Sequence, residues 1–364
     1  SLMLLEREAY LKSAKGAGDS GNGSYLRNFR SLCSNSLQIN IPRSRQGKFK
    51  PVTIELLNSQ KEQVNELALL LYRKGLSTRD VSNIMEDFFG ESISKDSISN
   101  MAESFHEIRQ SWESRQLDAY YKVIYCDALY TNLRRGNSYS KEAVYVIYGI
   151  KDDNTRELLL LEVNPTESSS VWREYLSKLR DRGLEQVDLI VADGLTGFAD
   201  AAREAYPCSK LQRCVVHLQR SILNKVRPKD KPEFSAGLKS IFNNFADNSN
   251  KQDALSKIEL FYDKWRGSYS QVLNKLLDDY FIIDYLTYID YPVEVRRMIY
   301  TTNSIENLNR QIRKVTKTKV TFEHEERLLD LIFMVISDFE TNNWQRYPLV
   351  AFQYWPERSN VLHN

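Results

Sequence analysis

The chain has 364 residues, of which 42% are hydrophobic, so it can bury a large core, and its length suggests two or three domains. The formal net charge is only +2, so any affinity for nucleic acid must come from local basic patches. No apolar run reaches the roughly 18 residues of a membrane span and no signal peptide is visible, so we expect a cytoplasmic protein with no membrane partner. Four scattered cysteines do not resemble a disulfide framework and fit a reducing compartment.

The first sixty residues predict small elements. Residues 1–24 combine part of an amphipathic helix with a Gly/Ser-rich linker, and because the pattern at Ser1 is already that of a helix interior, we expect this helix to be truncated. Residues 25–60 contain alternating apolar stretches and turn signals, which favour a small basic hairpin. Arg43 and Arg45 in this segment are candidate DNA contacts.

Residues 61–118 predict a helix-turn-helix DNA-binding domain. One amphipathic helix covers 62–74, Ser77 caps a second helix over 78–89, and Ser94 caps a third after a tight turn. In such a domain the N-terminal part of the third helix contacts DNA, which makes candidates of Lys95, Ser97 and Asn100. A purely structural three-helix unit is the alternative.

Residues 119–219 predict the first part of a catalytic domain. Three strand patterns, at 120–130, 142–150 and 156–163, are separated by turn-rich connections such as 133–141, which indicates an antiparallel meander. Helix and strand patterns then alternate, and crossovers of this length make the later strands parallel to the sheet. Three antiparallel strands followed by parallel strands match the ribonuclease H-like order.

The strand pattern then stops. Residues 220–299 are helical and aromatic and predict an all-helical insertion. Residues 300–364 predict the second part of the catalytic domain with C-terminal helices. The expected fold class is therefore α/β: a ribonuclease H-like domain with a mixed sheet, interrupted by the helical insertion and preceded by the helix-turn-helix domain.

Two aspartates lie at or near strand ends, where a sheet can present catalytic side chains. Asp127 lies near the end of the first predicted strand and Asp193 at the end of the fourth. A buried strand rarely carries a carboxylate, because an unpaired charge taken out of water costs several kcal/mol, and a divalent cation can offset that cost. The alternative is that each aspartate caps a loop or a helix, which is a strong alternative for Asp193 because Gly194 follows it.

Glu306 is the one acidic residue of a segment, 300–319, that is crowded with amides and cations. At helical spacing Ile305, Leu308 and Ile312 form an apolar face, and Glu306 and Asn309 lie on the other face. An ordinary surface pair with the arginine four residues further on is the alternative. The cations of this segment are candidate phosphate contacts: Arg310, Arg313, Lys314, Lys317 and Lys319.

Asp127, Asp193 and Glu306 together supply three oxygen ligands, enough to hold two Mg²⁺ ions in one active site. Two such ions roughly 3.5–4 Å apart can activate an attacking hydroxyl and stabilise the leaving oxygen of a phosphodiester. The pattern therefore predicts two-metal phosphodiester chemistry with no covalent nucleophile on the protein.

Three motifs carry a resemblance to a known family. They are Asp-Gly-Leu-Thr-Gly-Phe at 193–198, Cys-x-x-His at 214–217 and Thr-Thr-Asn-Ser-Ile-Glu at 301–306. From about Tyr25 to its C-terminus the sequence resembles bacterial insertion-sequence transposases of the Mutator-related group. The resemblance implies a ribonuclease H-like domain that depends on Mg²⁺ or Mn²⁺, hydrolyses DNA at element ends and transfers strands into a target. It also implies an Asp-Asp-Glu triad, which falls on Asp127, Asp193 and Glu306.

Two further residues have assignments with alternatives. His217 is expected near the active site, touching the scissile phosphate or a triad residue, with Cys214 packed below it; a satisfied core histidine is the alternative, and two ligands do not make a zinc site. Trp265 is a candidate for stacking on a flipped or unpaired base, although aromatic residues at helical spacing are more often part of a core.

The predicted function is that of a DNA transposase. It binds the terminal inverted repeats of an insertion sequence and target DNA, works as a homodimer that holds two element ends, and associates with the nucleoid when bound to DNA. One alternative is a catalytically silent DNA-binding regulator derived from a transposase, which the intact triad disfavours. Another is a ribonuclease H-like nuclease acting on RNA or hybrids, which the helix-turn-helix unit disfavours.

Overall fold

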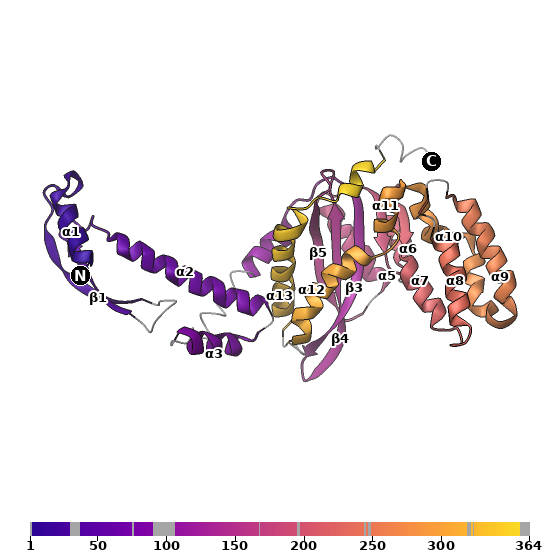
Figure 1. Ribbon diagram of the computed structural model, residues 1–364, viewed down its shortest axis with the longest axis horizontal. Helices are drawn as coiled ribbons and strands as arrows, with labels where there is room; N and C mark the ends of the chain where they lie inside the picture. Colours follow the sequence, from indigo (N-terminus) through magenta and orange to yellow (C-terminus); the bar gives the residue numbers. More distant parts are fainter. Residues whose placement is uncertain are drawn as a thin grey trace. The chain divides into compact units, whose positions relative to one another are not determined.

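The computed structural model describes residues 2–29, 37–74, 76–89, 106–166, 168–194, 197–243, 245–246, 249–318, 322 and 324–356. The chain divides into two compact units. The first comprises residues 1–108 with 317–319, and the second comprises residues 109–316 with 320–364. Figure 1 shows the elements coloured along the chain.

The first unit begins with a helix and a hairpin. Helix α1 (Leu2–Lys12) and the 3₁₀ turn η1 (Ala14–Gly16) precede strands β1 (Gly21–Phe29) and β2 (Leu37–Ser44). The two strands pair antiparallel over residues 21–44, which overlaps only in part with the segment 25–60 expected to form a hairpin. Because β1 begins at Gly21, part of the Gly-rich stretch that was expected to be a linker is strand.

Helix α2 (Val52–Arg73) follows the hairpin and begins directly after Pro51. Proline has no N–H to donate and is tolerated where a helix begins. The helix starts ten residues before Glu62, where the sequence pattern places its start. The domain boundary expected at residue 60 thus falls inside the helix.

Helix α3 (Thr78–Phe89) has the predicted bounds. Ser77 caps it, because the Asp80 backbone N–H donates to Ser77 Oγ at 3.1 Å, and the Ser77 hydroxyl donates in turn to Asp80 Oδ2 at 2.6 Å. The third helix of the predicted helix-turn-helix domain lies outside the described residues, as do its candidate DNA contacts Lys95, Ser97 and Asn100.

The second unit is built on a five-stranded sheet. Its strands are β3 (Tyr120–Arg135), β4 (Ser138–Ile150), β5 (Arg156–Asn164), β6 (Gln186–Ala192) and β7 (Lys210–Arg213). Their order is β5-β4-β3-β6-β7. β3 pairs antiparallel with β4 and β4 with β5, whereas β6 runs parallel to β3 and β7 parallel to β6. The predicted mixed sheet, three antiparallel strands followed by parallel ones, is confirmed.

The β3–β4 hairpin is longer than the sequence suggests. Residues 133–141 were expected to be a connection, but pairing continues to Arg135 opposite Ser138, and only Gly136 and Asn137 form the turn. Gly136 has a φ of 62°, the left-handed conformation that a two-residue hairpin turn requires. Most side chains at this end of the hairpin are exposed, so the apolar alternation that marks a strand is missing there.

Helices cover both faces of the sheet. On one face α5 (Ser169–Asp181) and α6 (Phe198–Ala205) share an apolar core with the strands, in which Trp172 is fully buried. On the other face lie α12 (Asn303–Thr318) and α13 (Glu325–Phe339) (Figure 1). A helix at 106–114 precedes β3, and α13 is followed by the π-helical turn η4 (Glu340–Trp344) and the 3₁₀ turn η5 (Val350–Tyr354).

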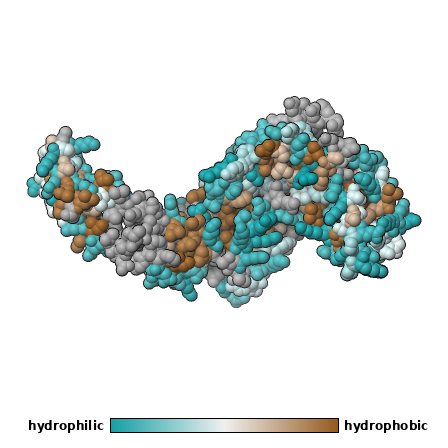
Figure 2. Space-filling model, viewed as in Figure 1, coloured by the Kyte–Doolittle hydropathy of each residue, from teal (hydrophilic) through white to brown (hydrophobic). Residues whose placement is uncertain are grey.

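Every element that the structure describes between residues 215 and 299 is helical, as predicted for the insertion. These elements are α7 (Val215–Leu223), α8 (Lys231–Phe242), α9 (Lys251–Leu273), η2 (Asn274–Leu277), α10 (Asp279–Leu286), η3 (Thr287–Asp290) and α11 (Val293–Ile299). Their visible surface is largely hydrophilic (Figure 2). Within the described ranges, no helix is both long enough and apolar enough to cross a membrane.

Glu340 makes the stability of the second unit depend on pH. Burial raises the pKa of this carboxyl to about 7, with a contribution from the charge of Glu157 and against a hydrogen bond from the Leu158 N–H at 3.3 Å. A folded-state pKa above the unfolded one stabilises the fold at low pH, and this stabilisation is lost as the pH rises through 7. Glu340→Gln stays neutral, so we expect it to be more stable than the parent by about 1–3 kcal/mol at pH 8, with little gain at pH 4. Urea unfolding at the two pH values measures this, and an equal difference at both would contradict it.

Candidate functional site

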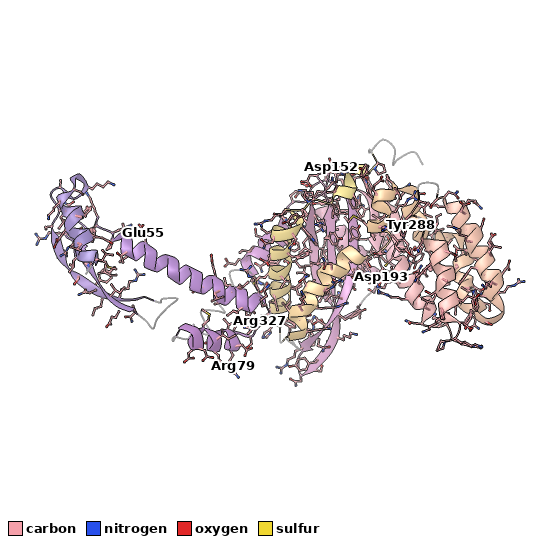
Figure 3. The ribbon with its side chains drawn as sticks, viewed as in Figure 1. Glu55, Arg79, Asp152, Asp193, Tyr288 and Arg327 are labelled. Atoms are coloured by element: carbon pink, nitrogen blue, oxygen red, sulfur yellow. The ribbon has the colours of Figure 1, made fainter. Side chains whose placement is uncertain are left out.

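The sheet brings the two predicted aspartates together. Asp127 lies within β3 and is 8% exposed. The parallel pairing of β3 with β6 ends at Cys126 opposite Ala192, so Asp193, the next residue after β6, emerges beside Asp127. Figure 3 shows Asp193 at the junction between the sheet and the helices of the insertion.

Helix α12 brings two more polar groups to this point. Its predicted apolar face is confirmed, because Ile305, Leu308 and Ile312 are fully buried. Asn309 was expected on the polar face with Glu306, but that prediction is wrong: Asn309 is only 2% exposed, and its Nδ2 donates to Asp127 Oδ2 at 2.5 Å. A buried amide is tolerated here because its Nδ2–H group donates a hydrogen bond to a carboxyl oxygen.

His217, on the first turn of α7, lies between two carboxylates. Its Nδ1 is 2.9 Å from Asp193 Oδ1, and its Nε2 is 3.6 Å from Glu306 Oε1. The shorter contact, between Nδ1 and Asp193 Oδ1, is an electrostatic contact without hydrogen-bond geometry, because among the described residues Nδ1 has no aligned hydrogen-bond partner. Glu306 is also 3.5 Å from the exposed Arg220. The structure thus brings Asp193, Glu306 and His217 together. The carboxylate oxygens of Asp127, Asp193 and Glu306 do not all lie within 4.8 Å of one another.

The charges of the site act on one another. Burial, followed by the charge of Asp193, raises the pKa of Asp127 to about 7. Burial also acts to raise the pKa of Asp193, but His217, the Gly194 N–H and Arg213 together bring it below its usual value. The contact with Asp193, and then that with Cys214, raises the pKa of His217 to about 10. His217 is therefore positively charged at neutral pH and neutralises part of the carboxylate charge.

Cys214 links two of the sequence motifs. Its Sγ accepts hydrogen bonds from the Thr302 backbone N–H at 3.5 Å and from Thr302 Oγ1 at 3.4 Å, and all three groups are buried. The adjacent Val215 N–H donates to the Tyr300 carbonyl at 3.3 Å. Cys214 thus packs next to His217, where the sequence places it, and holds the segment that leads into α12.

The other predicted contacts occupy separate places. On α12 the side chains of Arg310, Arg313, Lys314 and Lys317 are exposed, and Lys319 lies outside the described residues. Arg43 and Arg45 are exposed at the end of the hairpin of the first unit, where the Arg43 guanidinium lies 4.3 Å from the centre of the Tyr25 ring. Trp265 is half-buried on α9, with its ring centroid 5.1 Å from that of Phe234 and 5.8 Å from that of Tyr269.

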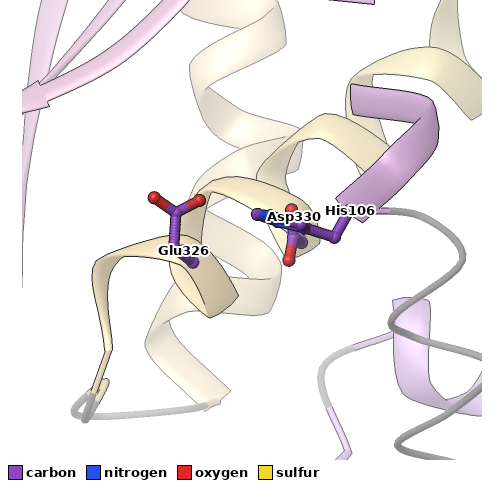
Figure 4. A group of neighbouring side chains, drawn as sticks. All are labelled: His106, Glu326 and Asp330. Atoms are coloured by element: carbon purple, nitrogen blue, oxygen red, sulfur yellow. The ribbon is translucent and has the colours of Figure 1, made fainter. Parts of the chain in front are cut away.

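A second acidic pair lies on α13, where Glu326 and Asp330 project from successive turns (Figure 4). Arg109 forms ion pairs with both, at 2.7 Å for Asp330, and with Glu113 as well. Its side chain is only 3% exposed. The guanidinium therefore compensates these carboxylates, and the cluster is a structural ion network.

The second unit is therefore an α/β protein with an acidic site on the inner strands β3 and β6 of a mixed sheet, to which a later helix adds a glutamate. Comparison with known proteins identifies the family. The model of the family described as "Transposase, Mutator family" matches residues 3–347. The chain belongs to this family.

Curated relatives agree with this assignment. The transposase for insertion sequence element IS905 of Lactococcus lactis is 33% identical over 93% of this chain and 84% of its own length. The transposase for insertion sequence element IS1201 of Lactobacillus helveticus is 33% identical over 88% and 84%. The transposase for IS256 in transposon Tn4001 of Staphylococcus aureus is 29% identical over 87% and 80%.

Proposed function

We propose that this chain is a DNA transposase that cleaves DNA at the terminal inverted repeats of an insertion sequence and joins the freed ends to target DNA. Its sheet order, three antiparallel strands followed by two parallel ones, fits a ribonuclease H-like catalytic domain. The observation that carries the proposal is the position of Asp127 and Asp193 on adjacent parallel strands, with Glu306 and Asn309 brought to the same place by α12.

The donor set fits divalent metal ions. Asp127, Asp193 and Glu306 offer hard oxygen atoms, and Asn309 Oδ1 is buried without a hydrogen-bond partner among the described residues. Buried carboxylates that repel one another need a compensating cation. We assign the three carboxylates as the ligands of two Mg²⁺ or Mn²⁺ ions, which when bound supply an activated hydroxyl and stabilise the leaving oxygen.

The chain's own residues orient this site. Asn309 fixes the Asp127 carboxylate through its Nδ2–H. His217 lies between Asp193 and Glu306, attracts both carboxylates, and brings a positive charge next to the place where the scissile phosphate would lie. We assign His217 a positioning role, with contact to that phosphate as its part in catalysis.

The exposed cations of α12 bind the DNA backbone in this proposal. Each phosphate contact adds about 0.9 to the slope of log affinity against log salt concentration. Arg310→Ala and Arg313→Ala should each weaken binding to end DNA and lower that slope by about one. Arg266→Ala removes another exposed arginine, on α9, whose side chain is 64% exposed, and should leave the slope unchanged. Equal slopes for all three variants would remove α12 from the DNA interface.

The first unit supplies end recognition in this proposal, through the helix-turn-helix domain and the hairpin residues Arg43 and Arg45. Two element ends must be held in one complex, so we propose a homodimer that acts on DNA in the cytoplasm. Sedimentation of the protein with end DNA would test this, and a complex with one protein chain and one DNA end would contradict it.

The proposed activity is tested by cleavage of labelled duplex DNA that carries a terminal repeat. We expect strand cleavage in Mg²⁺ or Mn²⁺ and none in EDTA. Binding without cleavage in any divalent metal would favour a silent DNA-binding regulator. Faster cleavage of an RNA–DNA hybrid of the same sequence would favour a ribonuclease H-like nuclease.

A further inference from the structure

A pocket of about 650 Å³ opens beside the acidic site. Asp193 and His217 are among its lining residues, and most of the rest come from α6, α7 and the insertion elements α9 to α10. Its volume lies in the range of about 300–1,000 Å³ that is typical of small-ligand sites. The proposed cleavage chemistry uses only the part of this space next to Asp193.

Arg213, the last residue of β7, lines the pocket with its guanidinium held against aromatic rings. Its Cζ is 5.2 Å from the centre of the Phe281 ring and 5.1 Å from that of Tyr285. A Cβ placed on Gly194 would lie 3.8 Å from Arg213 Nη2, so the guanidinium is next to the turn that carries Asp193. Among the described residues no carboxylate forms an ion pair with Arg213. The charge of Arg213 acts on the nearby carboxylates of Asp193 and Asp284, and its planar guanidinium, held against the two rings, is suited to a phosphate.

Tyr280, at the start of α10, adds a stacking surface to the same pocket. Its side chain is exposed, with 65% of the residue's surface accessible. Arg203 lies over the ring, with Cζ 4.7 Å from its centre, and Arg203 is fixed in turn by both oxygens of Asp284, at 2.8 and 2.7 Å. The ring is therefore supported by a fixed cation and can stack on a flat partner. Nucleic acid bases stack on such rings regardless of their sequence.

We propose that this pocket binds an unpaired nucleotide of the DNA strand, with its phosphate on Arg213 and its base on Tyr280. Lys225 and Lys275 also line the pocket and are exposed, and they offset the carboxylates of Asp200, Asp278 and Asp284 in the same lining. The inference rests on the proposed function and specifies its substrate as a DNA end that is unpaired by at least one nucleotide next to Asp193. Tyr280 is better placed for stacking than Trp265, whose ring packs against its neighbours in the insertion.

The test uses a short single-stranded DNA with 2-aminopurine at its end, bound in EDTA so that no strand is cut. Stacking quenches the fluorescence of this base. Tyr280→Ala should relieve the quenching and weaken binding by at least about fivefold, whereas Tyr280→Phe, which keeps the ring, should retain both. Tyr354→Ala is the matched control, since this tyrosine of η5 is 50% exposed and lies outside the pocket lining.

A second variant tests the phosphate contact. Arg213→Lys keeps the charge but loses the planar fork of the guanidinium. We therefore expect this variant to bind an oligonucleotide with a phosphate on the probed nucleotide more weakly than the parent does. For an oligonucleotide without that phosphate, the difference in affinity between variant and parent should be smaller. Equal losses with both oligonucleotides would show that Arg213 does not contact the phosphate and would overturn this part of the proposal.

Two outcomes would overturn the pocket itself. One is unchanged quenching and affinity in Tyr280→Ala. The other is equally tight binding of free deoxyadenosine monophosphate, which would make the pocket a mononucleotide site. Because the fluorescence readout needs no cleavage, the two proposals can fail separately. If Tyr280→Ala loses the quenching but the parent shows no metal-dependent cleavage, the nucleotide pocket is supported and the transposase function is not. If cleavage depends on Asp193 but Tyr280→Ala leaves the quenching unchanged, only the transposase function is supported.

Discussion

Asp193→Asn should lower the rate of DNA end cleavage by at least about 10³-fold, which corresponds to roughly 4 kcal/mol of barrier. The asparagine keeps the shape of the side chain at the end of β6, but it removes the negative charge that would hold a metal ion and pair with His217. Single-turnover cleavage of a labelled terminal-repeat duplex in Mg²⁺ measures the effect.

Two controls separate lost chemistry from lost structure. Asp181→Asn changes an exposed aspartate at the end of α5 and should cleave at the parental rate. Binding of the uncut duplex by Asp193→Asn should be at least as tight as that of the parent, because one negative charge near the DNA is removed. Cleavage by Asp193→Asn at the parental rate would refute the assignment of the triad.

Arg109→Met should lower the free energy of unfolding of the second unit by about 3–5 kcal/mol, because it leaves carboxylates without their buried partner. Three acidic side chains depend on this guanidinium: Glu113, Glu326 and Asp330. We expect Tm to fall by roughly 6–20 °C, as measured by thermal unfolding followed by circular dichroism.

The matched control is an exposed ion pair. Arg173 lies 2.7 Å from Glu204, with side chains that are 46% and 66% exposed. Because such pairs contribute at most about 1 kcal/mol, Arg173→Ala should scarcely change Tm. Equal losses in the two variants would mean that Arg109 contributes no more than a surface arginine.

The sequence was sufficient for the order and direction of the strands and for the place of Asp127 and Asp193 along them. Asp127 interrupts an apolar strand pattern and Asp193 directly follows one, and the parallel pairing of those strands follows from the length of the crossover between them. The apolar face of α12 was likewise visible in its periodicity. These features depend on local patterns or on rules of chain connection, which one sequence contains.

Other features depend on contacts between distant residues and were missed. Asn309 is polar, so helical spacing placed it on the outer face, yet the Asp127 carboxylate makes its burial favourable. Only the fold brings Phe281 and Tyr285 against Arg213. The sequence singled out Trp265 as a stacking residue because it lies among other aromatic residues. Spacing alone does not distinguish an aromatic ring in a core from one that lines a pocket.

The contact between Cys214 and Thr302 has a consequence for how this protein can vary. The chain leaves β7 just before Cys214 and reaches the start of α12 just after Thr302, 88 residues later in sequence, and the two residues lie within hydrogen-bond distance of each other. The helices between Cys214 and Thr302 form an inserted segment whose two ends are held next to each other by this contact. Lengthening such a segment costs little, because the entropy of closing a loop grows only with the logarithm of its length. We therefore expect that segments of the insertion remote from the pocket and from the sheet can be shortened or extended while the carboxylates keep their positions.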